Sequence, residues 1–369
     1  MSIPPAETQK ITRAPRTRPP ARGERSAAPT ARGRVRQIDV VKGLAIIGVM
    51  VQHAFSSSIL QDSWEILYAG QAVPIFFVIM GLNAAQSMAR RRVKFLADLY
   101  DSDYVKGRVQ RLVAPIGWIW PVALIAAVLV GAVHIGPLVL VGVLPISSAP
   151  GNYFVTIMLE FAVLFPAVFW YFNRAPVATT LVVAAADVGF ELLAPHVHAL
   201  GAAGPAHGYI YDAAIVKYGL AIMAGVWLSR VELGGRGLAL LTLLALGSVV
   251  YLVVVHQDPN GLTWLVSSFS RTTNFISVFY AVWLTYMGIR LIPAQSSGTV
   301  YRALEKLGRA SYHVFLVQIV WFGAITTRSW PMAIIGILAC SAIGYAFYLL
   351  MTSRRPRKAR PRRSAAARA

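Results

Sequence analysis

The chain has 369 residues, of which 56% are hydrophobic and only 14% are charged, against about 25% charged in an average soluble domain. This composition, with a mean hydropathy of +0.58, excludes a disordered chain and argues against a soluble globular protein. The formal net charge of +20 would suit a nucleic-acid-binding protein only if it covered a folded surface.

Two tails carry most of that charge. Residues 1–36 hold nine Lys and Arg against two acids, and residues 352–369 hold eight basic residues and no acid. The first tail cannot bury a core and is predicted to be disordered. We expect both tails to bind anionic membrane lipids and not nucleic acid. The sequence divides into a disordered basic tail at 1–36, a transmembrane domain at 37–352 and a basic tail at 353–369.

Between the tails, apolar segments of membrane-spanning length follow one another. A span needs about 20 apolar residues, and the sequence predicts an all-α polytopic helix bundle with ten spans. The predicted spans are 38–60, 68–89, 112–134, 153–173, 176–195, 214–230, 238–256, 269–291, 309–327 and 331–352.

The distribution of basic loops supports this count. Ten spans place both basic tails on one side, together with loop 90–111, which has seven basic residues against three acids, and the loop from Arg290 to Arg309. The opposite loops contain Arg328 as their only basic residue. By the positive-inside rule, both termini are predicted to be cytoplasmic, in a multi-pass protein of the cytoplasmic (inner) membrane.

The first span carries three ionisable residues, Asp39, Lys42 and His53, which are costly in lipid and point to function. The eleven-residue spacing from Lys42 to His53 puts both on one helix face, roughly 16 Å apart along the axis. Asp39 lies one turn before Lys42. The alternatives are a Lys42 that reaches the headgroups with Asp39 as its partner, and a neutral His53 bonded to a neighbouring helix.

The second span contains Val73-Pro74. A proline inside a spanning helix predicts a break that frees backbone groups beside a cavity, or alternatively an ordinary kink. Gly81, further along the same span, is predicted to permit close contact with another helix.

Further polar residues flank or enter later spans. Arg108 and Arg111 stand three apart, which suits them to bind phosphate or, alternatively, to anchor the helix to anionic lipid. Glu160 is a carboxylate inside a span, and Tyr153 lies seven residues earlier on the same face. His313 is predicted to be structural or interfacial, with a place in the lining of the site as the alternative. The single cysteine, Cys340, allows no disulfide, and no metal site is predicted.

With these residues in hand, the chain resembles the acyltransferase 3 family of integral membrane O-acyltransferases. The resemblance extends from about Arg36 to Phe322. It rests on five motifs in order: Asp39 with Lys42-Gly43-Leu44-Ala45 and His53, Val73-Pro74-Ile75-Phe76-Phe77, Arg108 with Arg111, Tyr153 with Glu160 and Pro166, and Leu307-Gly308 with Ser311-Tyr312. The chain departs from the family pattern where Lys42 replaces Arg, Met80 replaces Ser and Gln318 replaces the more usual His.

The resemblance implies transfer of an acyl group, usually acetyl, from acyl-CoA to a hydroxyl of a glycan, lipid or small molecule, with no bound cofactor. In this interpretation His53 is the general base, since an acceptor hydroxyl must lose its proton and histidine has the nearest pKa. Lys42, Arg108 and Arg111 would hold the donor phosphates at the cytoplasmic side, with Asp39 orienting Lys42.

Four more residues have provisional roles. Glu160 and Tyr153 would position the acceptor or the His53 ring, and Tyr312 and Gln318 are candidates to stabilise the oxyanion.

Two other classes of protein remain open. Ten helices with buried His, Glu and Arg would also serve a proton-coupled secondary transporter or flippase. The three departures from the family pattern would suit a member that binds or senses its ligand without turning it over.

Overall fold

The computed structural model describes residues 35–55, 57–91, 95–133, 144–146, 149–199, 213–258, 273–325 and 329–353. The tails predicted at 1–36 and 353–369 lie almost entirely outside this part of the chain, as does Arg328.

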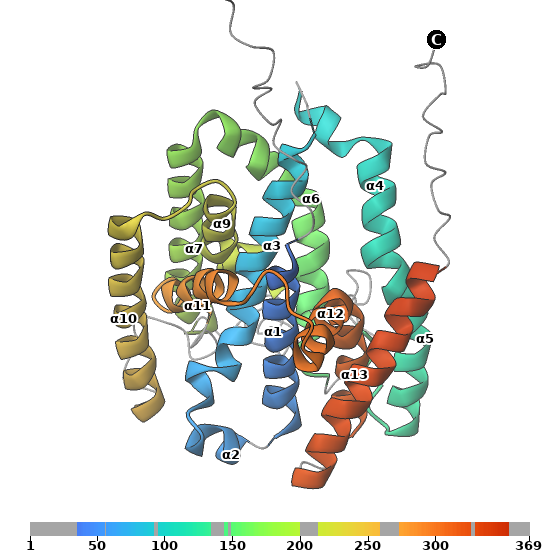
Figure 1. Ribbon diagram of the computed structural model, residues 1–369. Helices are drawn as coiled ribbons and strands as arrows, with labels where there is room; N and C mark the ends of the chain where they lie inside the picture. Colours follow the sequence, from blue (N-terminus) through green and yellow to red (C-terminus); the bar gives the residue numbers. More distant parts are fainter. Residues whose placement is uncertain are drawn as a thin grey trace, which may run out of the picture. The chain divides into compact units, whose positions relative to one another are not determined.

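Every regular element in the described residues is helical, as the composition predicts (Figure 1). The α-helices are α1 (Arg36–Ala54), α2 (Ser57–Asp62), α3 (Ala72–Ala89), α4 (Ser102–Arg108), α5 (Ala114–Leu129), α6 (Tyr153–Arg174), α7 (Pro176–Ala199), α9 (Gly219–Leu228), α10 (Gly235–Gln257), α11 (Val278–Leu291), α12 (Thr299–Ala324) and α13 (Trp330–Ser353). Short 3-10 turns are η1 (Glu65–Leu67), η2 (Ala69–Gln71), η3 (Leu96–Tyr100) and η6 (Ile215–Tyr218), and η4 (Val109–Val113) is a π-helical turn.

Each of the ten predicted spans overlaps at least one of these helices. Six helical stretches of the described chain are long and apolar enough to cross a membrane: Glu65–Ala89, Leu96–Leu129, Tyr153–Arg174, Pro176–Leu193, Gly235–Gln257 and Trp330–Ser353. They indicate a multi-pass membrane protein. The count of ten spans and the cytoplasmic position of both ends stay predictions.

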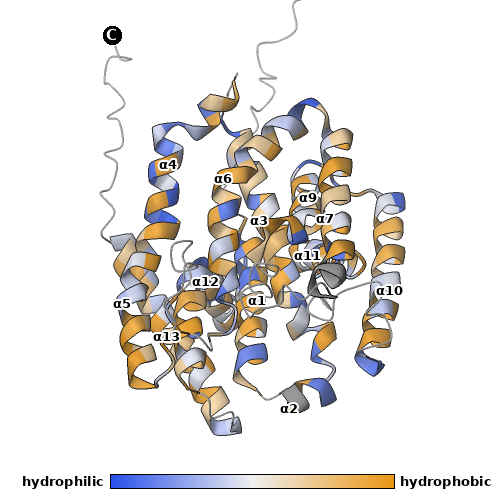
Figure 2. Ribbon diagram, turned by 180° about the vertical axis from the view of Figure 1, so that it is seen from behind, coloured by the Kyte–Doolittle hydropathy of each residue, from blue (hydrophilic) through white to orange (hydrophobic). Residues whose placement is uncertain are grey.

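The outer helices present apolar faces to their surroundings. In both overall views α10 stands at one edge of the bundle and α5 with α13 at the other, and these helices are coloured largely as hydrophobic (Figures 1 and 2). Ile125 of α5, Leu243 of α10 and Leu338 of α13 are among the large side chains exposed there. A soluble monomer rarely exposes such an area, so lipid is the medium that these faces require.

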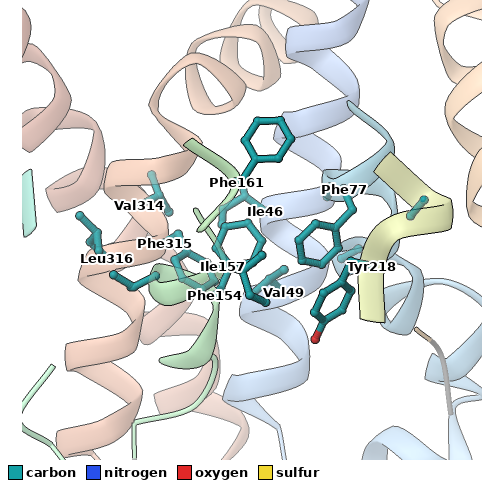
Figure 3. Close-up of a cluster of buried hydrophobic side chains, with 14 of the residues drawn as sticks. Ile46, Val49, Phe77, Phe154, Ile157, Phe161, Tyr218, Val314, Phe315 and Leu316 are labelled. Atoms are coloured by element: carbon teal, nitrogen blue, oxygen red, sulfur yellow. The ribbon is translucent and has the colours of Figure 1, made fainter. Parts of the chain in front are cut away.

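Aromatic side chains fill the centre of the bundle, between α1, α3, α6 and α12 (Figure 3). Phe154 of α6 lies with its ring centroid 5.4 Å from that of Phe77 and 4.7 Å from that of Phe315. Ile46 and Val49 of α1 are buried in the same cluster. This packing fixes α1 and α12 relative to the other helices.

Glycines set the closest helix contacts. A methyl group on Gly308 would overlap the carbonyl oxygen of Asp39, and one on Gly43 would overlap that of Leu304, so α1 and α12 meet backbone to backbone. The predicted close contact at Gly81 is confirmed, because the backbone of Ile222 in α9 lies against it. In a membrane, helices associate through such small residues because lipid competes for larger apolar ones.

The predicted break at Pro74 is wrong. Pro74 is the third residue of α3, and the helix continues without interruption to Ala89. The N–H groups of a first turn have no partner within the helix, so proline costs nothing there. The irregular backbone precedes it, in the 3-10 turns η1 and η2.

Two predicted loops are largely helical. Within 90–111, helix α4 begins behind Asp101, whose carboxylate accepts a hydrogen bond from the Tyr104 N–H (2.7 Å), and runs through η4 into α5. The loop predicted to end at Arg309 ends at Gly298 instead, because α12 begins at Thr299. Glu305 and Arg309 carry charges that are typical of a loop. In the structure they pair with each other and with residues of α1.

Candidate active site

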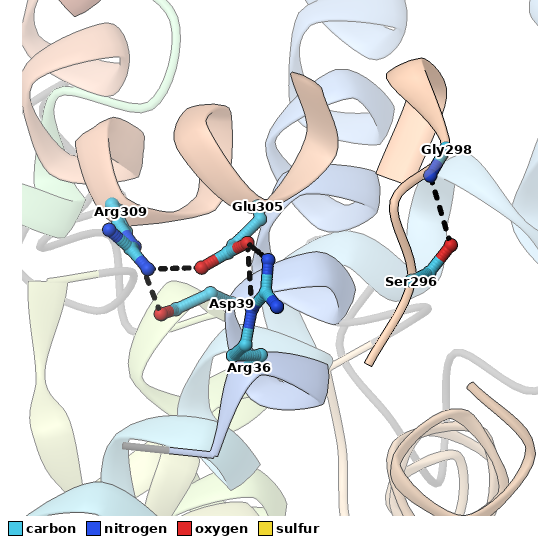
Figure 4. Close-up of polar contacts among 6 residues, drawn as sticks. All are labelled: Arg36, Asp39, Ser296, Gly298, Glu305 and Arg309. Carbon is cyan, nitrogen blue, oxygen red and sulfur yellow. Dashed lines mark hydrogen bonds and ion pairs between the residues drawn. The ribbon is translucent and has the colours of Figure 1, made fainter. Parts of the chain in front are cut away.

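An ion-pair network joins the first turn of α1 to Glu305 and Arg309, which lie further along α12 (Figure 4). The predicted pair between Lys42 and Asp39 is confirmed, with Nζ 2.9 Å from Oδ1. Arg309 of α12 bridges Asp39 (Nε to Oδ2, 3.7 Å) and Glu305. Arg36 donates to Glu305 Oε2 from Nε (3.0 Å) and Nη2 (2.6 Å). The network fixes Lys42 at the point where the two helices cross.

Lys42 faces a cavity of about 260 Å³. Its lining brings together the three predicted donor-binding cations from separate elements: Lys42 from α1, Arg108 from α4 and Arg111 from η4. The remaining residues that line it are Phe76, Ile79, Met80, Asn83, Ala84, Ser87, Phe154, Met158, Phe161, Ser311, Tyr312 and Phe315. Three cations together with aromatic side chains in one lining suit a ligand that has anionic groups at one end and an apolar arm.

The π-helical turn η4 shapes this lining. Arg111 lies within it, and Arg108 immediately precedes it, with its guanidinium 5.0 Å from the centre of the Tyr104 ring. The hydroxyl of Tyr312 donates to the backbone carbonyl of Leu112 (3.1 Å), so α12 holds the turn. π-Helical turns are rare and occur frequently at functional sites. Tyr312 therefore both lines the cavity and supports the segment that carries Arg111.

His53 lies at the other end of the polar stripe on α1. Its Nδ1 lies 2.7 Å from Oε1 of the buried Gln318. An amide oxygen accepts hydrogen bonds, so Nδ1 is the donor in this contact. The interpretation in which His53 is bonded to a neighbouring helix is confirmed, and it is compatible with a base that this bond orients.

Gln318 was expected at the oxyanion, but the contact that the structure gives it is with His53. A residue at this position that accepts from Nδ1 would fix the tautomer and the ring orientation of the base. Its distance in sequence from His53, 265 residues, explains why no local pattern showed the pairing.

The cavity does not include every residue predicted on α6. Among the described residues that line it, Phe154, Met158 and Phe161 come from α6, whereas Tyr153 and Glu160 lie outside the lining. Glu160 Oε2 accepts a hydrogen bond from the N–H of Ile215 (2.8 Å), where η6 begins. Glu160 thus stabilises the start of a neighbouring helical segment.

Sequence reasoning missed three polar residues of the cavity. Asn83 and Ser87 stand four residues apart on α3 and are exposed, while Ser311 precedes Tyr312. The spacing of Asn83 and Ser87 within an apolar span was a usable signal, since it puts both on one face. His313, as predicted, has a structural position, because its ring packs against Phe347 and Tyr348 of α13. The described residues contain no group of three metal-ligating side chains.

The comparisons with known proteins identify the family of this chain. A protein-family model for an acyltransferase domain, Acyl_transf_3, matches residues 35–352, and the chain belongs to this family. The resemblance found in the five sequence motifs is thereby confirmed. The comparisons with curated proteins and with solved structures give no match. Family and apolar helices together support an acyltransferase that spans a membrane several times.

The ion-pair network between α1 and α12 predicts a pH dependence of stability. Hydrogen bonds from Arg36, with the positive charge of Arg309, hold the pKa of Glu305 below its ordinary value. A lowered folded-state pKa stabilises the fold above the unfolded-state pKa, and this stabilisation is lost as pH falls through the folded value. We expect the melting temperature of the wild type in detergent to fall as the pH drops from about 5 to below about 4.

The matched variant is Glu305→Gln, which keeps the shape and removes the titration. Its melting temperature should be lower than that of the wild type near pH 7, and the difference should shrink as the pH falls. Parallel curves for the two proteins over this range would contradict the role given to Glu305.

Proposed function

We propose that the protein is a membrane O-acyltransferase that moves an acyl group, acetyl in the first instance, from acyl-CoA to a hydroxyl of a glycan, lipid or small molecule. The observation that carries the proposal is the continuity of the site. One cavity is lined by Lys42, Arg108 and Arg111. Phe315 also lines it, and both Phe315 and His53 lie against Gly151.

The arginines and the lysine of the cavity would bind different parts of the donor. Guanidinium groups bind phosphate oxygens in pairs, whereas a lysine provides a point charge. Arg108 and Arg111 would take the phosphates of CoA from the cytoplasmic side, and Lys42, held by Asp39, would add charge deeper along α1. Tyr312 and the aromatic lining would pack against the pantetheine arm.

The chemical step uses His53 as general base. Nε2 takes the proton of the acceptor hydroxyl as its oxygen attacks the thioester carbonyl, forming the new C–O bond. The tetrahedral intermediate collapses with cleavage of the C–S bond, and the CoA thiolate receives the proton from the imidazolium. Gln318 keeps Nδ1 protonated, so that Nε2 is the nitrogen that exchanges the proton.

A second function has one observation in its favour. Asp187 and Glu191 of α7 and Lys217 of η6 are buried, and Asp187 Oδ2 accepts from the Leu220 N–H (2.8 Å). Ionisable groups at such depth also occur in proton-coupled transporters. The alternative is therefore a secondary transporter or flippase that works through this cluster.

Labelled acetyl-CoA separates these functions. Membranes containing the wild type should yield labelled product and free CoA, and mass spectrometry of glycan, lipid and metabolite extracts identifies the acceptor. Proton-coupled uptake without donor consumption would establish the transporter instead. Donor that binds and is never consumed would show a ligand-binding member of the family.

The arginines give a quantitative test of donor binding. Arg108→Ala and Arg111→Ala should each raise the KM for acetyl-CoA about ten- to a hundredfold with a smaller change in kcat, because a charge-assisted contact is worth about 1.5–3 kcal/mol. Lys106→Ala is the matched control, since Lys106 is exposed on α4 and outside the cavity lining. An unchanged KM in both arginine variants would place the donor elsewhere.

A further inference from the structure

Phe315 stands between the cavity and His53. On α12, Tyr312, Phe315 and Gln318 follow one another at three-residue steps, so they form one ridge of the helix. Tyr312 and Phe315 line the cavity, and Gln318 contacts His53. Phe315 is 4% exposed. The ring of Phe315 thus closes the inner end of the cavity, and His53 lies on the far side of that ring from Tyr312.

Two neighbouring residues pack against this ring. Phe154 lies against it with ring centroids 4.7 Å apart (Figure 3). Gly151 is the second, since a Cβ there would be 3.3 Å from Phe315 Cζ and 3.2 Å from His53 Cε1. Phe315 and the imidazole therefore converge on the same backbone position.

The segment that carries Gly151 is itself anchored. Gly151 adopts a left-handed conformation with φ of 78°, which glycine tolerates best. The next residue, Asn152, exchanges two hydrogen bonds with the backbone of Leu144: Oδ1 accepts from its N–H (2.9 Å) and Nδ2 donates to its carbonyl (3.0 Å). Because Asn152 is buried, these bonds hold Gly151 against the two rings.

We propose that Phe315 sets the size of the acyl group that the enzyme transfers. The inference rests on the proposed function. For the thioester carbonyl to reach the acceptor oxygen near His53, the acyl chain beyond that carbonyl must fit against the Phe315 ring. Phe154 and Gly151 pack against this ring and keep it in place. Two or a few carbons fit beside it, and a long chain collides with it. The bonds made and broken in the transfer are unchanged.

The test compares donors of different chain length on the same protein. Membranes containing wild type, Phe315→Leu or Phe315→Ala receive acetyl-, butyryl- or octanoyl-CoA, and release of free CoA thiol gives kcat/KM for each donor. The ratio of octanoyl-CoA to acetyl-CoA is independent of the amount of enzyme. We expect this ratio to rise at least about tenfold in Phe315→Ala and less in Phe315→Leu, since each methylene accommodated changes selectivity by about tenfold or more.

Phe172→Leu is the matched control, because Phe172 is buried on α6 but lies outside the cavity lining. Its ratio should equal that of the wild type. A wild type that uses octanoyl-CoA as well as acetyl-CoA would overturn the role of Phe315 in chain-length selection, and so would a ratio unchanged in both Phe315 variants. Either result would leave the proposed function intact. A wild type that releases CoA from no donor would overturn the proposed function and this inference with it. Phe315→Leu keeps most of the buried volume, so it tests the proposal even where Phe315→Ala does not fold.

Discussion

Acyl transfer by His53→Ala is expected to be about 10²- to 10⁴-fold slower than by the wild type, the range that general-base catalysis contributes. The loss should fall on kcat, since the cations proposed to bind the donor, Lys42, Arg108 and Arg111, are untouched and line a cavity that His53 does not. Single-turnover release of CoA from saturating acetyl-CoA measures it directly.

Two further variants define what the imidazole does. Gln318→Ala removes the acceptor at Nδ1 and should slow transfer about tenfold, because the base is still present but no longer oriented. Gln52→Ala changes the neighbouring residue, which points 100° away around α1, and should transfer at the wild-type rate. A His53→Ala protein that is folded and fully active would remove His53 from the chemistry, and the cavity would then need another base.

Gly308→Val is expected to prevent folding, because the new side chain would occupy the space of the Asp39 carbonyl. Backbone atoms cannot move aside as a flexible side chain can, so α1 and α12 would have to separate. Separation would also break the contact between Arg309 and Asp39 and pull Gln318 from His53. We expect the free energy of unfolding to fall by more than about 4 kcal/mol, a loss that single substitutions cause only when they disrupt the packing severely.

Size-exclusion chromatography of a fluorescent fusion in detergent measures the effect as loss of the monodisperse peak. Gly247→Ala is the matched control, since a Cβ at Gly247 in α10 meets no atom within 4 Å. That variant should be as stable as the wild type or slightly more so, because alanine favours a helix by up to about 1 kcal/mol. A normal peak for Gly308→Val would mean that the two helices do not cross so closely.

The sequence by itself determined the features that depend on helix geometry and on composition. Low charge and high hydropathy specify a helical membrane bundle. The spacing from Lys42 to His53 specifies one polar stripe, and the three-residue step from Asp39 to Lys42 specifies their ion pair, which the structure contains. These contacts are local, so the fixed pitch of a helix suffices to predict them.

The tertiary structure alone decided which residues of different helices meet. Nothing within α12 shows that Gln318 accepts from His53 or that Phe315 closes the cavity beside it, and nothing within α6 shows that Glu160 caps η6. Such contacts depend on how close two helices approach and at what angle. Here Gly43 and Gly308 set that approach, and the resulting crossing brings residues hundreds of positions apart into one site.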